Sequence, residues 1–249
     1  MRIIFSIARR ELNAYFETAI GWLYLLGFIG LSGFIFAWII TVYTDPMAGM
    51  GQTIDINEMI IPDFFGTMVV FLLLLSPALS MRSFAEDRSN RSLELLLSAP
   101  ISTTQIVLGK YFGTLGFVAL MLAGTSHCVI LLRWMGEPSL TLVLMNYLAT
   151  FLLAASFMAV GLLTSAFTRS QLISLALSFS LLLGLWFLAG VGEQASGDIE
   201  SVLSYASTLS HLDTMSKGLL HTKDLVYFIT FIAFFLFATH QRIEAERWT

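Results

Sequence analysis

Charged residues are scarce in this chain of 249 residues. Asp, Glu, Lys and Arg make up 12% of it, while hydrophobic residues make up 57%. An ordinary soluble domain carries about 25% charged residues. With so little charge the chain cannot cover an apolar core with a polar surface, and a lipid bilayer is the solvent that suits it. The composition therefore excludes an ordinary soluble domain and predicts an integral membrane protein.

Cysteine and the common catalytic motifs are lacking as well. The single cysteine, Cys128, excludes an internal disulfide and a Cys-rich metal site, and its apolar surroundings indicate a packing role. Neither HExxH nor GxSxG occurs, and no Lys/Arg cluster is dense enough to indicate nucleic acid. The pair Gly109-Lys110 lacks the preceding glycine and the following Ser or Thr of a phosphate-binding loop. We expect a non-catalytic protein without metal or cofactor, whose energy comes from another polypeptide.

Six apolar runs are each near the length that a helix needs to cross a hydrocarbon core of about 30 Å. They predict an all-α integral membrane fold with six transmembrane helices, in a single domain that covers residues 1–249. The runs comprise residues 19–43, 64–81, 111–132, 142–167, 172–191 and 225–240.

Two flanking segments predict helices that do not cross the membrane. Residues 1–18 place apolar side chains at helical spacing with arginines between them, which is typical of an interfacial helix. In the outer segment 192–224, Leu209, Leu212 and Met215 recur at helical spacing and Asp198 is a possible N-cap. We expect one or two short helices there, on the outer face of the membrane.

The distribution of Lys and Arg predicts the orientation. If the N-terminus is cytoplasmic, ten of the thirteen Lys and Arg residues fall on the inner side. Because inner loops of membrane proteins carry the excess of positive charge, both termini are expected in the cytoplasm.

Away from their ends, the six runs contain almost no ionisable side chain, and His127 in the middle of the third run is the exception. Ion-coupled carriers usually hold buried Asp, Glu, His or Arg side chains along their pathway. We therefore interpret His127 first as a residue that hydrogen-bonds between helices. A lipid-linked, amphipathic or bulky apolar substrate suits such spans better than a small ion.

The inner segment 82–110, between the second and third runs, has the most informative pattern. Its charges at i,i+4 spacing, Arg82–Glu86 and Asp87–Arg91, predict two ion pairs on a helix that extends inward from the second span. Such pairs position a helix and add little stability, about 0.2–0.5 kcal/mol each.

The remainder of the same segment predicts a short helix between two breaks. Its leucines at positions 93 and 95–97 are too apolar to lie freely in water, and Pro100 ends the helix that they form. Ser102, with Gln105 three residues later, predicts a capping box that begins the next helix. The leucines require a partner, or else the segment is an amphipathic loop anchored at the membrane surface.

The sequence Phe84-Ala85-Glu86-Asp87-Arg88, then Ser92-Leu93-Glu94-Leu95-Leu96-Leu97-Ser98-Ala99-Pro100, then Gly109-Lys110, resembles the inner-loop signature of ABC-2-type transporter permeases. The order of an interfacial helix, six spans and a long outer segment before the last span resembles that family along the whole chain. The resemblance implies an ABC-2 (type V exporter-like) transmembrane domain whose coupling helix binds a cytoplasmic ABC ATPase subunit. The residues implied at that contact are Glu86, Asp87, Arg88, Arg91, Ser92, Glu94, Leu95, Ser98, Pro100 and Arg169.

Within that family, residues 216–218, 224–228 and the tail near Arg247-Trp248 resemble the permease subunit associated with gliding motility. The resemblance implies a half-transporter in a bacterial inner membrane, paired with an identical or related second permease subunit for ATP-driven export. A second hypothesis is an ATPase-linked subunit for membrane assembly or motility that acts on a partner protein. A third is an ion-coupled carrier, against which the ion-poor spans argue.

Overall fold

The structure, a computed structural model, describes residues 2–44, 55–98, 101–194 and 207–247. Within these ranges the elements are helical and no strand occurs. Six helical segments are long and apolar enough to cross a membrane, which confirms the all-α fold with six spans. They are Ala19–Thr44, Ile56–Ser89, Thr103–Met135, Leu140–Phe167, Gln171–Leu188 and Thr222–Arg247.

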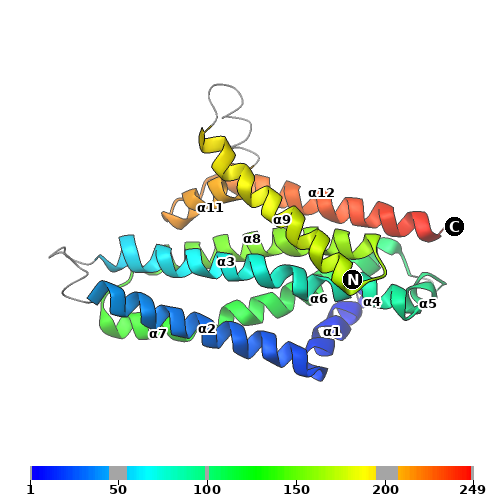
Figure 1. Cartoon of the computed structure of the whole chain (residues 1–249), viewed down its shortest axis with the longest axis horizontal. Coiled ribbons are helices and arrows are strands. Elements are labelled where there is room, and N and C mark those ends of the chain that lie inside the picture. The colour runs from blue at the N-terminus through cyan, green and yellow to red at the C-terminus, as the bar shows by residue number, and fades with distance from the viewer. Residues whose placement is uncertain (1, 45–54, 99–100, 195–206, 248–249) are drawn as a thin grey trace.

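Four of these segments are single helices, and two are composite (Figure 1). The single ones are α2 (Ala19–Thr44), α8 (Leu140–Phe167), α9 (Gln171–Gln194) and α12 (Thr222–Arg247). The second segment comprises η1 (Ile56–Ile60), α3 (Ile61–Ser80) and α4 (Arg82–Ser89), and the third comprises α6 (Thr103–Gly124) and α7 (Ser126–Met135). Three further helices are α1 (Arg2–Glu17), α5 (Ser92–Ser98) and α11 (Thr208–Ser216).

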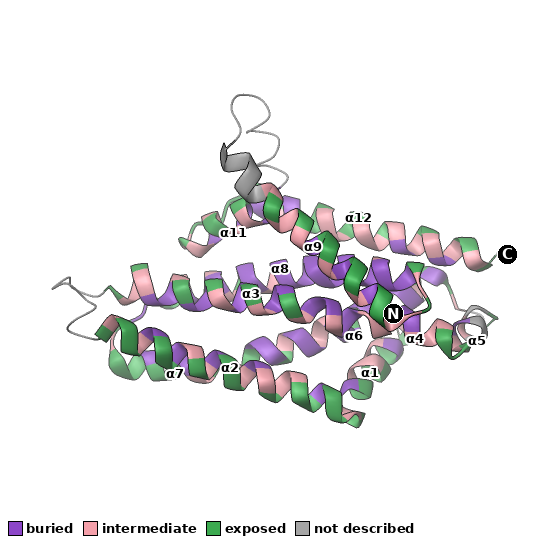
Figure 2. Ribbon diagram, viewed as in Figure 1, coloured by how far each residue is buried: buried purple, intermediate pink, exposed green. Residues whose placement is uncertain are grey.

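Helix α8 lies at the centre of the bundle (Figure 2). Over an apolar stretch of 18 residues in α8, 78% of the residues are buried. Over the corresponding stretches of α2 and α12, only 22% are buried. Helices α3, α6, α9 and α12 all pack against α8, whereas α2 packs mainly against α3 and α1. The helices with the least burial therefore present apolar faces to the outside, as expected where lipid is the solvent.

The third predicted run was expected to be one helix, but Thr125 interrupts it. The Thr125 hydroxyl donates to the Leu122 carbonyl at 2.6 Å, and Nδ1 of His127 lies 2.7 Å from the Gly124 carbonyl oxygen. Side chains that bond to the nearby backbone in this way compete with regular helix. Because Nε2 of His127 contacts Sγ of Cys128 at 3.2 Å, both ring nitrogens bond within the same span. The predicted hydrogen bond from His127 to another span is therefore wrong.

In the outer segment, α11 confirms a helix at the predicted Leu209, Leu212 and Met215. Its N-cap is Ser207, whose hydroxyl accepts from the Ser210 N–H at 3.4 Å, and the helix packs against α8. The N-cap predicted at Asp198 lies outside the described residues.

Helix α1 packs along the first half of α6, so it is attached to the bundle as well as helical as predicted. Two glycines of α6 make this close packing possible. A Cβ atom built on Gly109 would lie 2.6 Å from Cβ of Ile7, and one on Gly113 would lie 2.5 Å from Cβ of Glu11. Small residues at such points let helix backbones approach closely.

This packing generates a prediction with a control on the same helix. Gly113→Ala should destabilise the protein by about 1–3 kcal/mol, because the added methyl group overpacks the contact with α1. Gly116→Ala should leave the stability unchanged or slightly raised, because a Cβ there meets only Leu12 Cδ1, at 3.8 Å, and alanine favours helix. Thermal unfolding of the purified protein in detergent measures both effects, and equal melting temperatures for the two variants would contradict the packing.

Candidate functional site

One end of the molecule gathers α4, α5, the first turns of α6, helix α1 and the C-terminal end of α12 (Figure 1). These elements come from the beginning, the middle and the end of the chain. Both ends of the described chain therefore meet the predicted inner segment 82–110 at the same place.

Helix α4 continues α3 with only Met81 between them, and Ser165 of α8 holds this junction. The Ser165 hydroxyl accepts from the backbone N–H groups of Phe84 and Ala85 at 2.9 and 3.0 Å, and it donates to the Met81 carbonyl at 3.0 Å. Phe84 and Ala85 are fully buried. The start of α4 is thus fixed to the most buried helix of the bundle.

The chain then turns sharply between α4 and α5. Arg91 has a φ of 57°, in the left-handed region that few non-glycine residues adopt. The predicted pair Arg82–Glu86 is confirmed, with Nε of Arg82 2.9 Å from Oε2 of Glu86. The predicted pair Asp87–Arg91 is wrong, because α4 ends at Ser89 and the carboxylate of Asp87 is taken by other partners.

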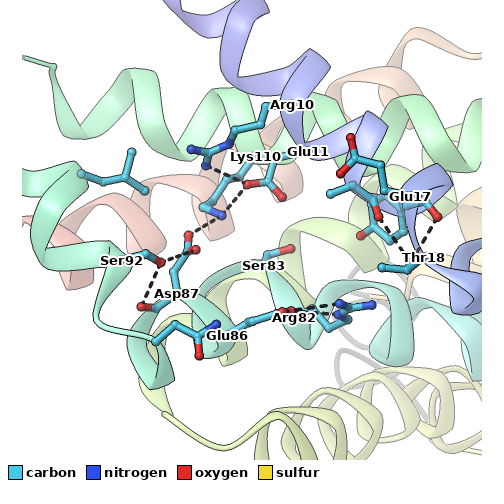
Figure 3. Close-up of a pocket in the computed structure, with 14 residues that line it drawn as sticks. Arg10, Glu11, Glu17, Thr18, Arg82, Ser83, Glu86, Asp87, Ser92 and Lys110 are labelled. Atoms are coloured by element: carbon cyan, nitrogen blue, oxygen red, sulfur yellow. Dashed lines mark hydrogen bonds and ion pairs between the residues drawn. The ribbon is translucent and has the colours of Figure 1, made fainter.

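Those partners form a buried ionic cluster around Lys110 (Figure 3). Lys110 Nζ lies 2.6 Å from Oε1 of Glu11 in α1 and 2.7 Å from Oδ2 of Asp87 in α4, and the lysine side chain is only 2% exposed. Its ammonium group also lies 5.3 Å from the centre of the Phe84 ring. The Ser92 hydroxyl, at the start of α5, donates to Oδ1 of Asp87 at 2.8 Å. We call Glu11, Asp87 and Lys110 the lysine triad.

A second ionic link joins α4 and α6 to the end of α12. Arg88, 7% exposed at its side chain, contacts Oε1 of Glu246 at 2.5 Å, and Arg242 contacts the same oxygen at 2.8 Å. The Thr103 hydroxyl at the start of α6 donates to the carboxylate of Glu244. Ile243 between these residues is fully buried. The last turns of α12 are therefore part of the same structural unit as the inner segment.

A cavity of about 590 Å³ opens between α1, α4, α5 and α6 (Figure 3). The lysine triad forms one wall, and Arg10, Glu17, Arg82 and Glu86 line the others. Tyr15 also lines it and donates its hydroxyl to the Leu79 carbonyl at 2.9 Å. Burial, with a smaller effect from the charge of Glu11, raises the pKa of the Tyr15 phenol, so that it remains a donor. Among the described residues no group of His, Cys, Asp or Glu is suited to a metal ion.

The predicted contact residues divide into two groups by their surroundings. Asp87 and Arg88 are engaged in the links just described, while Ser92 bonds Asp87 and Glu86 bonds Arg82. Arg91, Ser98 and Arg169 are exposed. Pro100 and the side chains of Glu94 and Leu95 lie outside the described residues.

Sequence reasoning missed the partners that fix this segment from far along the chain. For Glu11, Ser165 and Glu246 the partner that fixes this segment lies more than seventy positions away, so no local pattern reveals that link. The sequence indicates Lys110 only as the last residue of the signature that resembles ABC-2 permeases. The pattern that could have pointed to it is a lone lysine followed directly by an apolar helix, since such a charge requires partners when buried.

The capping box predicted at the start of α6 is confirmed. The Ser102 hydroxyl accepts from the Gln105 N–H at 3.3 Å, and the Gln105 side chain accepts from the Ser102 N–H at 3.3 Å. The capping box therefore fixes where α6 begins, just after the segment that contains α5.

A second buried polar cluster lies at the opposite end, between α11 and α12. Nδ1 of His211 is 2.6 Å from Oδ1 of Asp224, and the imidazole stacks on the Tyr227 ring at 4.1 Å. Asp224 is fully buried. This pair joins α11 to the beginning of the last span.

Comparison with known proteins places these observations in one family. No curated protein matches the chain. Residues 19–240, which include the first five spans, most of the sixth and the whole inner segment, match the model of the family described as ABC-2 family transporter protein. The match covers most of the chain and agrees with its helical membrane fold. The chain is therefore a multi-pass membrane protein that belongs to the ABC-2 transporter family.

Proposed function

We propose that the chain is the permease subunit of an ATP-driven ABC-2 export complex, and that a separate cytoplasmic ATPase subunit binds α5 and its flanking turns. The observation that carries this proposal is the way in which α5 is held by the two helices on either side of it. It is a short helix between α4 and α6, and both of those helices are tied to the bundle by buried polar contacts. A segment mounted in this way can transmit force, whereas a loosely anchored surface loop cannot.

The contacts suggest the route by which force reaches the spans. A displacement of α5 acts on Asp87 through the Ser92 hydroxyl, and Asp87 is bonded to Lys110 at the start of the third span. It also acts on α4, which continues into α3 and is linked by Arg88 to α12. One movement on the cytoplasmic side is therefore distributed to the second, third and sixth spans.

The complete transporter, in this proposal, contains two permease subunits and two ATPase subunits in a bacterial inner membrane, with both permease termini in the cytoplasm. The second permease subunit is a second copy or a related chain. Export of a lipid-linked, amphipathic or bulky apolar substrate suits the charge-poor helices, of which α8 contains no charged residue.

The resemblance to the gliding-motility subfamily includes residues 224–228, where Asp224 and Tyr227 form the outer polar cluster. The resemblance supports a second candidate function, in which the complex moves or anchors a partner protein. ATPase activity that depends on a protein partner and persists without a transported solute would favour it.

Docking is tested by charge reversal on the exposed side of the inner segment. Arg91→Glu combined with Arg169→Glu should lower co-purification of the ATPase subunit about tenfold or more, since losing charge-assisted contacts costs about 2–5 kcal/mol. The matched control is Arg133→Glu at the end of α7, which is also exposed but lies far from the inner segment. Membrane insertion should be normal in both variants, and unchanged co-purification of the double variant would contradict docking at this place.

The lysine triad is tested by comparing one substitution with a neutral replacement of all three residues. Lys110→Met alone should destabilise the subunit by about 3–5 kcal/mol, because it leaves buried carboxylates without their cation. Adding Glu11→Gln and Asp87→Asn should restore most of the melting temperature. The triple variant should still bind the ATPase but lose transport-coupled ATP hydrolysis. Wild-type coupling in a stable triple variant would show that force bypasses the triad.

Orientation is tested with single cysteines in a Cys128→Ser background. Ser98→Cys, at the exposed end of α5, should react with a membrane-impermeant maleimide only after the cells are permeabilised. Glu137→Cys, exposed after α7, should react in intact cells. Labelling of residue 98 from outside would place the inner segment on the wrong side for an ATPase and would overturn the proposed function.

A further inference from the structure

The cavity between α1, α4, α5 and α6 has a charge pattern that the docking role does not use. In the lysine triad one ammonium group is paired with two carboxylates, and Arg10 lies 3.4 Å from Oε1 of Glu11. Four further charged side chains line the cavity, two of each sign: Arg10 and Glu17 from α1, and Arg82 and Glu86 from α4. Counted with the triad, the lining carries three cationic and four anionic side chains. A lining with both signs is suited to a zwitterion, while a purely anionic ligand would meet uncompensated carboxylates.

Ser83 lines the cavity and is only 4% exposed. Its hydroxyl oxygen is buried and has no hydrogen-bond partner among the residues that the structure describes. Figure 3 shows it between the lysine triad and the Arg82–Glu86 pair. Because buried hydroxyl groups in native proteins nearly always find a partner, this oxygen indicates a site for a ligand that accepts a hydrogen bond.

The residues around the cavity are of the kind found at a membrane surface. The cavity is lined by Glu17 and Thr18, where α1 ends and the first span begins. On either side of this point, Phe5 of α1 and Trp22 of α2 are exposed apolar side chains, 72% and 48% exposed. Amphipathic helices and tryptophans of this kind mark the boundary between lipid tails and headgroups. The ligands most abundant at that depth are lipid headgroups.

We propose that this cavity binds the ammonium–phosphate headgroup of a phosphatidylethanolamine-type lipid. Arg10, Arg82 and the Ser83 hydroxyl donate to the phosphate, and Glu17 and Glu86 accept from the primary ammonium. The volume of about 590 Å³ is within the range of about 300–1,000 Å³ typical of small-molecule sites. Binding there braces α1 against α4 beside the lysine triad, so the lipid supports the geometry of the inner segment.

Two features of this chemistry distinguish the proposed ligand from other lipids. A primary ammonium has N–H donors for two carboxylates, whereas a choline headgroup has none. A phosphatidylglycerol headgroup has the phosphate but no cation for Glu17 and Glu86. The site should therefore prefer phosphatidylethanolamine over both.

The experiment uses the purified permease subunit alone, so its result is independent of ATPase docking. Native mass spectrometry with equal amounts of phosphatidylethanolamine, phosphatidylcholine and phosphatidylglycerol should show preferential retention of phosphatidylethanolamine. Glu17→Gln and Arg10→Gln should each lower that retention about tenfold, the effect of losing one charge-assisted hydrogen bond. Arg9→Gln is the matched control, because Arg9 is the exposed neighbour of Arg10 and does not line the cavity.

A parallel arm distinguishes the lipid from a soluble source of the same headgroup. Free phosphoethanolamine should bind far more weakly than the lipid, because it lacks the acyl chains that remain in the bilayer. Equal binding of the free headgroup would keep the ammonium–phosphate chemistry but overturn the assignment to lipid. Equal retention of all three lipids, or retention unaffected by Glu17→Gln and Arg10→Gln, would overturn the site itself.

Discussion

The ammonium group of Lys110 imposes the constraint on which the inner end of this protein depends. A lysine that is 2% exposed cannot remain charged without close partners, because its hydration is lost. Those partners come from two other helices, Glu11 on α1 and Asp87 on α4. The cost of burying one charge thus determines where three helices meet. It also explains the close approach at Gly109 and Gly113, which brings Glu11 within reach of the lysine.

The same constraint explains why Asp87 does not pair with Arg91, its neighbour on the local helical pattern. An exposed pair at i,i+4 spacing is worth about 0.2–0.5 kcal/mol. Removing a carboxylate partner from a buried lysine costs several times as much folding free energy as an exposed pair contributes. Asp87 therefore contacts Lys110, α4 ends at Ser89, and Arg91 is available for the tight turn into α5. The local rule failed here because a stronger interaction from another helix competes for the same carboxylate.

The sequence was sufficient for the features set by hydropathy and by short-range hydrogen bonds. The six spans, the interval between α4 and α6, the Arg82–Glu86 pair and the capping box at Ser102 all depend on residues within a few positions of one another. The roles of Ser165 and Glu246 could not be predicted from the sequence, because they hold α4 through contacts between helices that meet only in the folded bundle. The break at Thr125 was missed because hydropathy does not register a hydroxyl that bonds to its own backbone.

The positions of the polar clusters limit how any movement can pass through the bundle. Buried polar contacts lie at both ends of the bundle: ion pairs around Lys110 and Glu246 at one end, and the His211–Asp224 contact at the other. Helix α8, which joins the two ends, has only uncharged residues, and its Ser156 hydroxyl bonds within the helix, to the Leu152 carbonyl. No Asp, Glu, His, Lys or Arg side chain is present on this helix to carry charge or protons along it. In the proposed function, movement of the inner segment reaches the opposite end through displacement of packed helices, whose ends the polar clusters fix to one another.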